Sequence, residues 1–392
     1  MDTLISEDAL HRASSVTAAL REASDRIEQA RELPAEIVTA LHDARLFRLL
    51  LPAALGGDEL DPTTLSKVTE TIAAADASTA WCLGQGAGCA MAAAFLDPGI
   101  ADAVFGPSDA VLAWGAGIQG KAVAVDGGYR VSGRWTFASG SRHATWLGGH
   151  SFLFEADGTT PRLGPDGRRL NRTALFRRDQ ADIDDNWHVI GLCGTGSDSY
   201  AVEDLFVPEA YTLDRENPSE CHVDGDVFQL TTTQVYASAF SGVMLGIARG
   251  ALDDLLAIAL TKTPRGAASS LRDSEAFHLQ LAELEARYRA ARALLHATQS
   301  ELWDLVQSRS ALTTEHRAGI RLATTHAINQ GHDVVVDAYR LAGQHAIFES
   351  GTLERRLRDA SAASQQVQGR KTHYVTVGRV LLGLEPDATM YL

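Results

Sequence analysis

The sequence contains few cysteines, and none of them are spaced for a metal or redox motif. Among its 392 residues, the four cysteines form no C-x-x-C pair. Zinc sites and the disulfide frameworks of small secreted domains depend on such patterns. We therefore expect four buried, free thiols of the kind found in a reducing compartment. They are Cys82, Cys89, Cys193 and Cys221.

Positive charge and long apolar runs are also scarce. The formal net charge is −15 at pH 7, and no basic block offsets it, so neither nucleic acid nor an anionic membrane is expected as a partner. No stretch approaches the roughly 18 apolar residues of a membrane span. The opening MDTLISEDALHRASSV carries acids where a secretory signal would be apolar. These features favour a cytoplasmic protein.

Several catalytic motifs are missing as well. The 13 histidines lack metal-site spacing, so no metal is expected, and there is neither a G-x-S-x-G elbow nor a P-loop. One G-x-G-x-x-G match, Gly115 to Gly120, is followed by the strand-like KAVAVDGGY. A dinucleotide site needs a helix at that point. Hydrolase, kinase and Rossmann-type functions are disfavoured, while a glycine loop beside a flat ligand remains open.

The hydrophobic pattern divides the chain into three parts. Residues 1–108 have the spacing of helices, residues 109–222 alternate with a period of two, and residues 223–392 return to helical spacing. We therefore predict an N-terminal helical domain, a central antiparallel β domain and a C-terminal four-helix bundle. The predicted fold class is α+β, with helix predominant.

Local signals place some of the helix ends. Asp61 or Thr63 suits the N-cap of a helix whose first turn holds Pro62. Apolar residues step by four and three from Phe277 to Leu305, which predicts one long helix with a continuous seam. A later helix is expected to end at Gly343, because glycine favours helix C-termini.

One stretch, VSGRWTFASGSRHATW at 131–146, gathers aromatic side chains and serines around a glycine turn. The alternation of Tyr129, Val131, Trp135 and Phe137 after a D-G-G turn predicts a strand with one buried face. Alternating aromatics are typical of a sheet core. A planar, apolar, hydrogen-bonding cofactor would also need an aromatic wall and a few polar groups. Both interpretations remain open from the residues alone.

Four segments follow one another along the chain: LFRLLLPAALGGDELDPTTLSKVTETIAAADASTAW, YRVSGRWTFASGSRHATW, GLCGTGSDSYAVEDLFVPE and RLAGQHAIFESGTLERRLRDASAAS. Together they resemble the acyl-CoA dehydrogenase superfamily, and in particular its branch of two-component, group D flavin-dependent monooxygenases. The resemblance covers nearly the whole chain. It implies the same succession of helical domain, β domain and helical bundle.

The resemblance implies a flavin, FMN or FAD, lying along the hairpin. Carried over residue by residue, Phe137, Ala138 and Ser139 occupy the flavin-contact positions, with Trp135 and Ser141 nearby. A hydrogen bond to flavin N5 would suit Ser139 or Ser141.

Other positions carried over from the family concern a second subunit. Gly343 and Gln344 match a turn that meets the cofactor of a neighbouring subunit, and Arg265 falls within one residue of an arginine that binds flavin phosphate across the dimer. The string Thr195-Gly196-Ser197 is interpreted as shaping a loop. Because the bundle and the cofactor site are shared between subunits in this superfamily, a homotetramer is implied.

The two branches of the superfamily differ in one catalytic group. Dehydrogenases commonly place a glutamate after an Arg-Asp-Ala string, and monooxygenases commonly place a histidine there. Here RDA at 358–360 is followed by SAASQQVQGRKTH, with no acid before His373. The position falls on Gln366, or on Val367 or Gln368 after a shift of one or two residues. An amide accepts no proton at neutral pH, which disfavours α,β-dehydrogenation.

The same glutamine also departs from the monooxygenase pattern. Gln366 could orient the substrate or hold a hydroperoxide by hydrogen bonds. His143, His345 or His373 could instead supply the base, although a lone histidine is often structural. A third alternative is a substrate that needs no deprotonation.

We therefore predict the oxygenase component of a two-component flavin-dependent monooxygenase. It would take reduced flavin from a separate flavin reductase and react it with O₂, through a C4a-hydroperoxide, to hydroxylate a small aromatic substrate. Ser139, His143 and Gln366 are the catalytic candidates. Two alternatives are an acyl-CoA dehydrogenase-like flavoprotein dehydrogenase or oxidase with an unusual base, and a non-catalytic assembly partner.

Overall fold

The computed structural model describes residues 2–263 and 270–388. Its first part is helical, and α3 begins as the sequence predicts. Asp61 is the N-cap, because its carboxylate accepts a hydrogen bond from the Thr64 backbone N–H at 2.9 Å, and Pro62 stands in the first turn. The helices of this part are α1 (Asp2–Ala30), α2 (Ala35–Asp43), α3 (Pro62–Ala73), α4 (Ala77–Ala90) and α5 (Pro98–Phe105).

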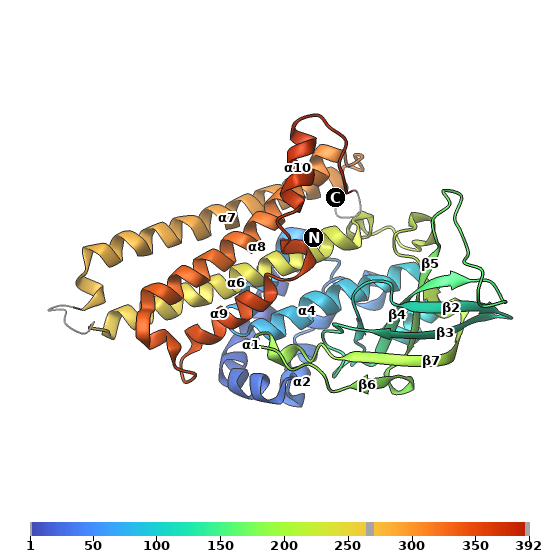
Figure 1. The fold of residues 1–392 in the computed structure, drawn as a ribbon, viewed down its shortest axis with the longest axis horizontal. Coiled ribbons are helices and arrows are strands. Elements are labelled where there is room, and N and C mark those ends of the chain that lie inside the picture. Colours follow the sequence, from blue (N-terminus) through green and yellow to red (C-terminus); the bar gives the residue numbers. More distant parts are fainter. Residues whose placement is uncertain (1, 264–269, 389–392) are drawn as a thin grey trace.

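A single sheet forms the middle of the chain and lies at one end of the molecule (Figure 1). Within the described residues its order is β6-β7-β3-β2-β4-β5-β8, with β1 beside β4. The β1–β4 and β2–β4 pairs are parallel, and the others are antiparallel. The strands are β1 (Leu112–Trp114), β2 (Gly120–Val125), β3 (Gly128–Trp135), β4 (Trp146–Phe154), β5 (Asn171–Arg177), β6 (Asp182–Asp184), β7 (Ser199–Pro208) and β8 (Thr212–Leu213).

Long helices form the last part, and α6 packs against both α3 and α8 (Figure 1). The predicted seam is confirmed: one helix, α7, buries Phe277, Leu284 and Leu295 on the same side. Gly343 ends α8 with a φ of +61°, a conformation that favours glycine. The helices are α6 (Thr232–Thr261), α7 (Glu275–Gln307), α8 (Thr314–Ala342), α9 (Thr352–Ala363) and α10 (His373–Leu381).

Trp135 belongs to the core of the sheet. It is fully buried, stacks on Tyr200 with ring centroids 5.4 Å apart, and donates from Nε1 to the His150 carbonyl at 2.9 Å. A Cβ at Gly120 would lie 2.4 Å from its ring, and one at Gly149 would lie 2.6 Å away. Gly120, the last glycine of the G-x-G-x-x-G match, therefore makes room for Trp135.

The cysteines are free, as expected, but only two are buried. Cys82 and Cys89 lie in the core, where burial raises the pKa of the Cys89 thiol to about 12. Cys193 and Cys221 are half-buried, so the expectation of four buried thiols is wrong for these two, which lie in connecting segments. None of the described helices combines the length and apolarity needed to cross a membrane.

Candidate functional site: a pocket between α4, the sheet and the C-terminal helices

A pocket of about 390 Å³ collects side chains from all three parts of the chain. Its walls come from α4, from the turn after β3, from the segment between β6 and β7, and from the residues after α9. Its surface is mostly apolar and combines aromatic side chains with polar groups, as in many small-molecule sites. Aromatic lining residues are Trp81, Phe137, Trp187 and Phe240.

The aromatic wall has two halves. Trp81 of α4 stacks on Phe240 of α6 with centroids 4.1 Å apart, and Phe137 meets Trp187 edge to face at 5.9 Å. Phe137 is 63% exposed and has a φ of +61°. A left-handed backbone disfavours a bulky side chain by roughly 1–2 kcal/mol. An exposed phenyl ring held in this conformation beside a pocket is suited to contact a flat ligand.

A chain of hydroxyl groups forms the polar side of the pocket. The Oγ atoms of Ser139 and Ser197 are 2.7 Å apart, and Ser197 Oγ is 2.7 Å from Thr195 Oγ1. Trp81 Nε1 donates to Ser139 Oγ at 3.1 Å, and Thr195 Oγ1 donates to the Leu192 carbonyl at 2.8 Å. The three hydroxyl residues are all buried and all line the pocket. The Thr195-Gly196-Ser197 string, interpreted from sequence as shaping a loop, thus also contributes side chains to the site.

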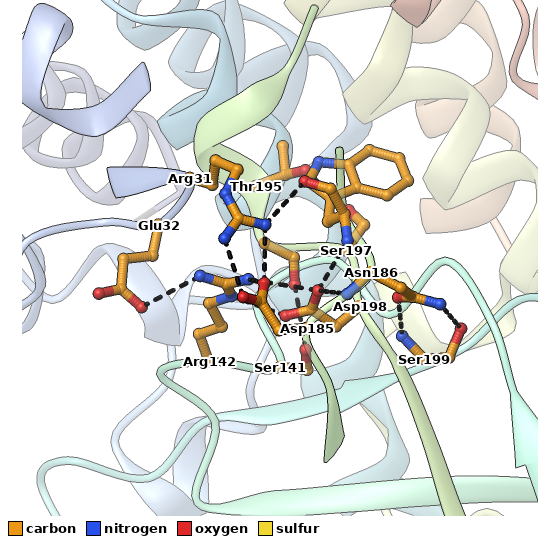
Figure 2. A network of polar contacts seen from close by, with 12 residues as sticks. Arg31, Glu32, Ser141, Arg142, Asp185, Asn186, Thr195, Ser197, Asp198 and Ser199 are labelled. Carbon is orange, nitrogen blue, oxygen red and sulfur yellow. Dashed lines mark hydrogen bonds and ion pairs between the residues drawn. The ribbon is translucent and has the colours of Figure 1, made fainter. Parts of the chain in front are cut away.

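A network of charged groups supports this polar side (Figure 2). Asp198 is 1% exposed and accepts from Arg142 Nε at 2.6 Å, from the Asn186 N–H at 3.1 Å and from the Trp187 N–H at 3.0 Å. Asp185 links Arg142 to Arg31, each at 2.7 Å. Arg31 directly follows α1, so the network fastens the segment that carries Trp187 to the N-terminal helices.

The residues at the end of α9 and after it form the C-terminal wall of the pocket. The Gln366 side chain accepts from the Gln368 N–H at 2.6 Å and caps a short 3₁₀ turn. Arg370 is exposed and lines the pocket, and its side chain makes no ion pair or hydrogen bond within the described residues. Asp359 accepts from the Leu192 N–H at 2.6 Å and so joins this wall to the opposite one. Burial, opposed by that hydrogen bond, raises the pKa of Asp359 to about 7.

Three of the side chains proposed from the sequence as catalytic or flavin-contacting groups line the pocket: Phe137, Ser139 and Gln366. Val367, the alternative to Gln366, lines it as well. Ala138 is fully buried between Phe137 and Ser139. Ser141 lies outside the lining, since its hydroxyl is buried and donates to the Gly196 carbonyl at 3.1 Å. Trp135 also lies outside it, in the sheet core, so it does not form part of the pocket wall.

The histidine candidates lie outside the pocket lining as well. His143 packs its ring on Phe47 at 5.6 Å, and burial, helped by the nearby His42 and Arg178, lowers its pKa to about 4. His373 is buried, with Nε2 2.7 Å from the Val367 carbonyl. His345 is exposed in the turn after α8.

The positions expected to meet a second subunit are also away from this pocket. Gly343 and Gln344 are exposed in the turn between α8 and α9. Arg265 lies outside the described residues.

Sequence reasoning gave no role to Gln85 or Arg370, and it missed Trp187. A polar residue four positions after Trp81 on a largely buried helix was the available signal for Gln85.

Comparisons with known proteins identify the family of the chain. Family models match residues 12–99 (acyl-CoA dehydrogenase, N-terminal domain) and residues 238–368 (acyl-CoA dehydrogenase, C-terminal domain). Indole-3-acetate monooxygenase of Pseudomonas putida is 30% identical over 359 residues, covering 92% of this chain and 90% of that one. The FADH₂-dependent resorcinol hydroxylase oxygenase component of a Rhizobium species is 27% identical over 96% of this chain and 94% of that one.

A solved structure shares the whole fold. The crystal structure of the HsaA monooxygenase from M. tuberculosis superposes with a TM-score of 0.88 at 26% identity, covering 98% of this chain and 99% of that chain. The order of helices, sheet and helices is therefore common to both proteins.

Proposed function

The chain belongs to the acyl-CoA dehydrogenase family, within its flavin-dependent monooxygenase branch, and on that premise we propose that the pocket beside Ser139 holds reduced flavin next to a small aromatic substrate. The protein is an oxidoreductase, the oxygenase component of a flavin-dependent monooxygenase, and it uses reduced flavin and O₂. The observation that carries the proposal is the pocket itself, in which an aromatic wall faces a buried chain of hydroxyls.

The residues present fit a flavin ring. Phe137 and Trp187 offer apolar faces to a planar ligand, and Ser139 offers a hydrogen-bonding group at the base of that wall. Bound reduced flavin supplies the electrons that let one atom of O₂ enter the substrate while the other leaves as water. The protein would orient the two reactants and exclude bulk water with its aromatic lining.

The lining also restricts the substrate. None of the described residues that line the pocket carries a carboxylate or an imidazole, so a phenol would find no general base to remove its proton. An electron-rich ring that reacts without losing a proton first, such as an indole, suits this lining better. The unpaired Arg370 at the pocket offers a partner for a substrate carboxylate. We therefore favour an aromatic acid of the indole-3-acetate type.

The test is a hydroxylation assay with a separate flavin reductase, NADH, FMN or FAD, and O₂. Indole-3-acetate, indole and phenol are compared, and products are identified by mass spectrometry with ¹⁸O₂. We expect one labelled oxygen atom in the indole products and little product from phenol. Arg370→Gln should raise the KM for indole-3-acetate about tenfold, the effect of losing one charge-assisted hydrogen bond, and leave that for indole unchanged.

Arg370→Lys serves as the matched control, because it keeps the charge. If Arg370→Gln raises the KM values for indole-3-acetate and indole equally, Arg370 does not bind the substrate carboxylate. If no substrate class gains a labelled oxygen, the proposed use of the pocket is wrong.

The assembly is proposed on related grounds. Large apolar side chains are exposed on the bundle helices and on the turn after α8, which is typical of surfaces covered by another subunit. A homotetramer formed through these surfaces would bring Gly343 and Gln344 of one subunit to the cofactor of another. A separate flavin reductase would supply this assembly with reduced flavin. Light scattering gives the assembly mass directly. The exposed residues include Leu256, Leu260, Leu279, Ile347 and Phe348.

A further inference from the structure

The hydroxyl chain of the pocket runs between two groups of opposite hydrogen-bonding character. At one end, the Trp81 indole N–H can only donate, and it points to Ser139 Oγ at 3.1 Å. At the other end, the Leu192 carbonyl can only accept, and Thr195 Oγ1 lies 2.8 Å from it. Two further N–H groups, the Trp187 indole and the Thr195 backbone, also point at that carbonyl, at 3.1 and 3.2 Å. The acceptor end of the chain is therefore fixed.

These end groups determine where each hydrogen in the chain lies. The Thr195 hydroxyl must donate its hydrogen to the Leu192 carbonyl. In its contact with Ser197 Oγ at 2.7 Å, Thr195 Oγ1 can therefore only accept. Ser197 therefore donates to Thr195, and at 2.7 Å from Ser139 it can in turn only accept. Ser139 consequently directs its own hydrogen at Ser197, away from the pocket. Such chains are cooperative, which strengthens this one arrangement.

The result defines what Ser139 offers to a ligand. Its hydrogen is committed to Ser197 and one lone pair is occupied by Trp81, so the group left for the pocket is an acceptor. A reduced isoalloxazine carries a hydrogen on N5 and can donate there. An oxidised isoalloxazine has a bare N5 and can only accept. Two acceptors facing each other in a buried site repel, whereas a donor and an acceptor bind.

We propose that Thr195 and Ser197 are positioning residues, which hold Ser139 as a hydrogen-bond acceptor toward the pocket and so favour reduced over oxidised flavin. The inference rests on the proposed placement of flavin beside Ser139. It gives a role to the Thr195-Gly196-Ser197 string. Ser197 lies 58 residues after Ser139 in the sequence, but the two side chains are within hydrogen-bonding distance in the fold.

The test compares dissociation constants for the two redox forms. Oxidised FMN and FAD are titrated by quenching of flavin fluorescence, and reduced FMN and FAD by calorimetry under anaerobic conditions. The measured quantity is the ratio of the oxidised to the reduced dissociation constant for each variant. Unlike an activity, this ratio is insensitive to losses of stability that weaken both forms equally.

Two substitutions should reverse the direction of the chain. In Thr195→Val, Ser197 loses its acceptor and can turn its hydrogen toward Ser139, which frees the Ser139 hydrogen for the pocket. In Ser197→Ala, Ser139 loses its acceptor directly. We expect both to lower the ratio roughly tenfold, the effect of one hydrogen bond gained or lost in a buried site. That change corresponds to about 30 mV in the two-electron potential of the bound flavin.

Thr195→Ser is the matched control, because it keeps the hydroxyl and should keep the wild-type ratio. If both Thr195→Val and Ser197→Ala bind flavin with the wild-type ratio, the inference is overturned while the proposed function stands. If the wild-type protein binds neither redox form of FMN or FAD, the proposed function fails and the inference fails with it.

Discussion

The two walls of the pocket are built by different means. The wall beside the sheet is fixed by a buried carboxylate with several donors, by a directed chain of hydroxyls and by a backbone in the left-handed region at Phe137. The wall after α9 is held by helix packing and a short 3₁₀ turn, and it presents the exposed Gln365 and the unpaired Arg370 to the pocket. The wall beside the sheet is tied together by many hydrogen bonds, whereas the wall after α9 has few.

The two walls are therefore suited to different ligands, one to the cofactor and the other to the substrate. A cofactor has one shape, so the groups that contact it gain from being fixed before it binds. The substrate varies between related enzymes. Side chains whose polar groups are free can be replaced to bind a new substrate without disturbing the fold. The comparison predicts that substitutions in the sheet-side wall cost stability, whereas those in the C-terminal wall change recognition.

Asp198→Asn should have the largest effect, because it breaks the network of the sheet-side wall. The half-buried Arg142 would keep the exposed Asp185 but lose its buried partner Asp198, and removing one partner of a buried ion pair costs up to about 3–5 kcal/mol. We expect a loss of that order in the free energy of unfolding, measured by urea denaturation with tryptophan fluorescence. Flavin binding should weaken as well, because the Trp187 N–H is held by the same carboxylate.

Asp185→Asn is the matched control for this prediction. Asp185 also bonds Arg142, at 2.7 Å, but its side chain is 64% exposed, and exposed ion pairs contribute little. Equal losses of stability in the two variants would mean that burial of Asp198 is not what fixes this wall.

Asp359→Asn tests the link between the two walls and should have an intermediate effect that depends on pH. Burial raises the pKa of Asp359 to about 7, so the folded protein holds this proton in a pH range where the unfolded chain releases it. Wild-type stability should therefore fall as the pH rises from about 4 to 7 and then level off. The size of the change is on the order of 3–4 kcal/mol, since each pKa unit corresponds to about 1.4 kcal/mol.

The asparagine variant removes this titration and retains a carbonyl to accept from the Leu192 N–H. Above pH 7 it should be more stable than the wild type, and its stability should change less between pH 4 and 7. Denaturation midpoints measured across this range give the comparison. Parallel pH profiles for the two proteins would show that Asp359 is already ionised in the folded state at low pH.

Much of the fold could be predicted from the sequence, because its signals are local. The period of two around Trp135, the N-cap at Asp61 and the steps of four and three along α7 each depend on neighbours in the chain. The site was harder to predict. The alternation predicts that Trp135 and Phe137 share one buried strand face, which is wrong for Phe137. The strand β3 ends at Trp135 in the sheet core, and Phe137 follows it in a left-handed turn, where it is exposed and lines the pocket.

The polar side of the pocket could not be predicted for a physical reason. Ser139 and Ser197 are hydrogen-bonded across 58 residues, and Leu192 meets Asp359 across 167. No periodicity encodes such contacts, because they depend on how separate elements pack. His143 follows the turn after β3 in the sequence, yet its ring packs on Phe47 and does not line the pocket.

Gln366→Ala should have the smallest effect on stability. Its side chain caps a single 3₁₀ turn by accepting from the Gln368 N–H at 2.6 Å, and losing such a cap costs about 0.5–1 kcal/mol. Gln365→Ala is the control, since Gln365 is exposed and its side chain bonds the neighbouring Ser364 side chain, at 3.3 Å. We expect near wild-type unfolding for both and a raised substrate KM for Gln366→Ala alone, because Gln366 is the more enclosed of the two at the pocket. A loss of stability as large as that of Asp198→Asn would mean that the C-terminal wall is as tightly built as the wall it faces.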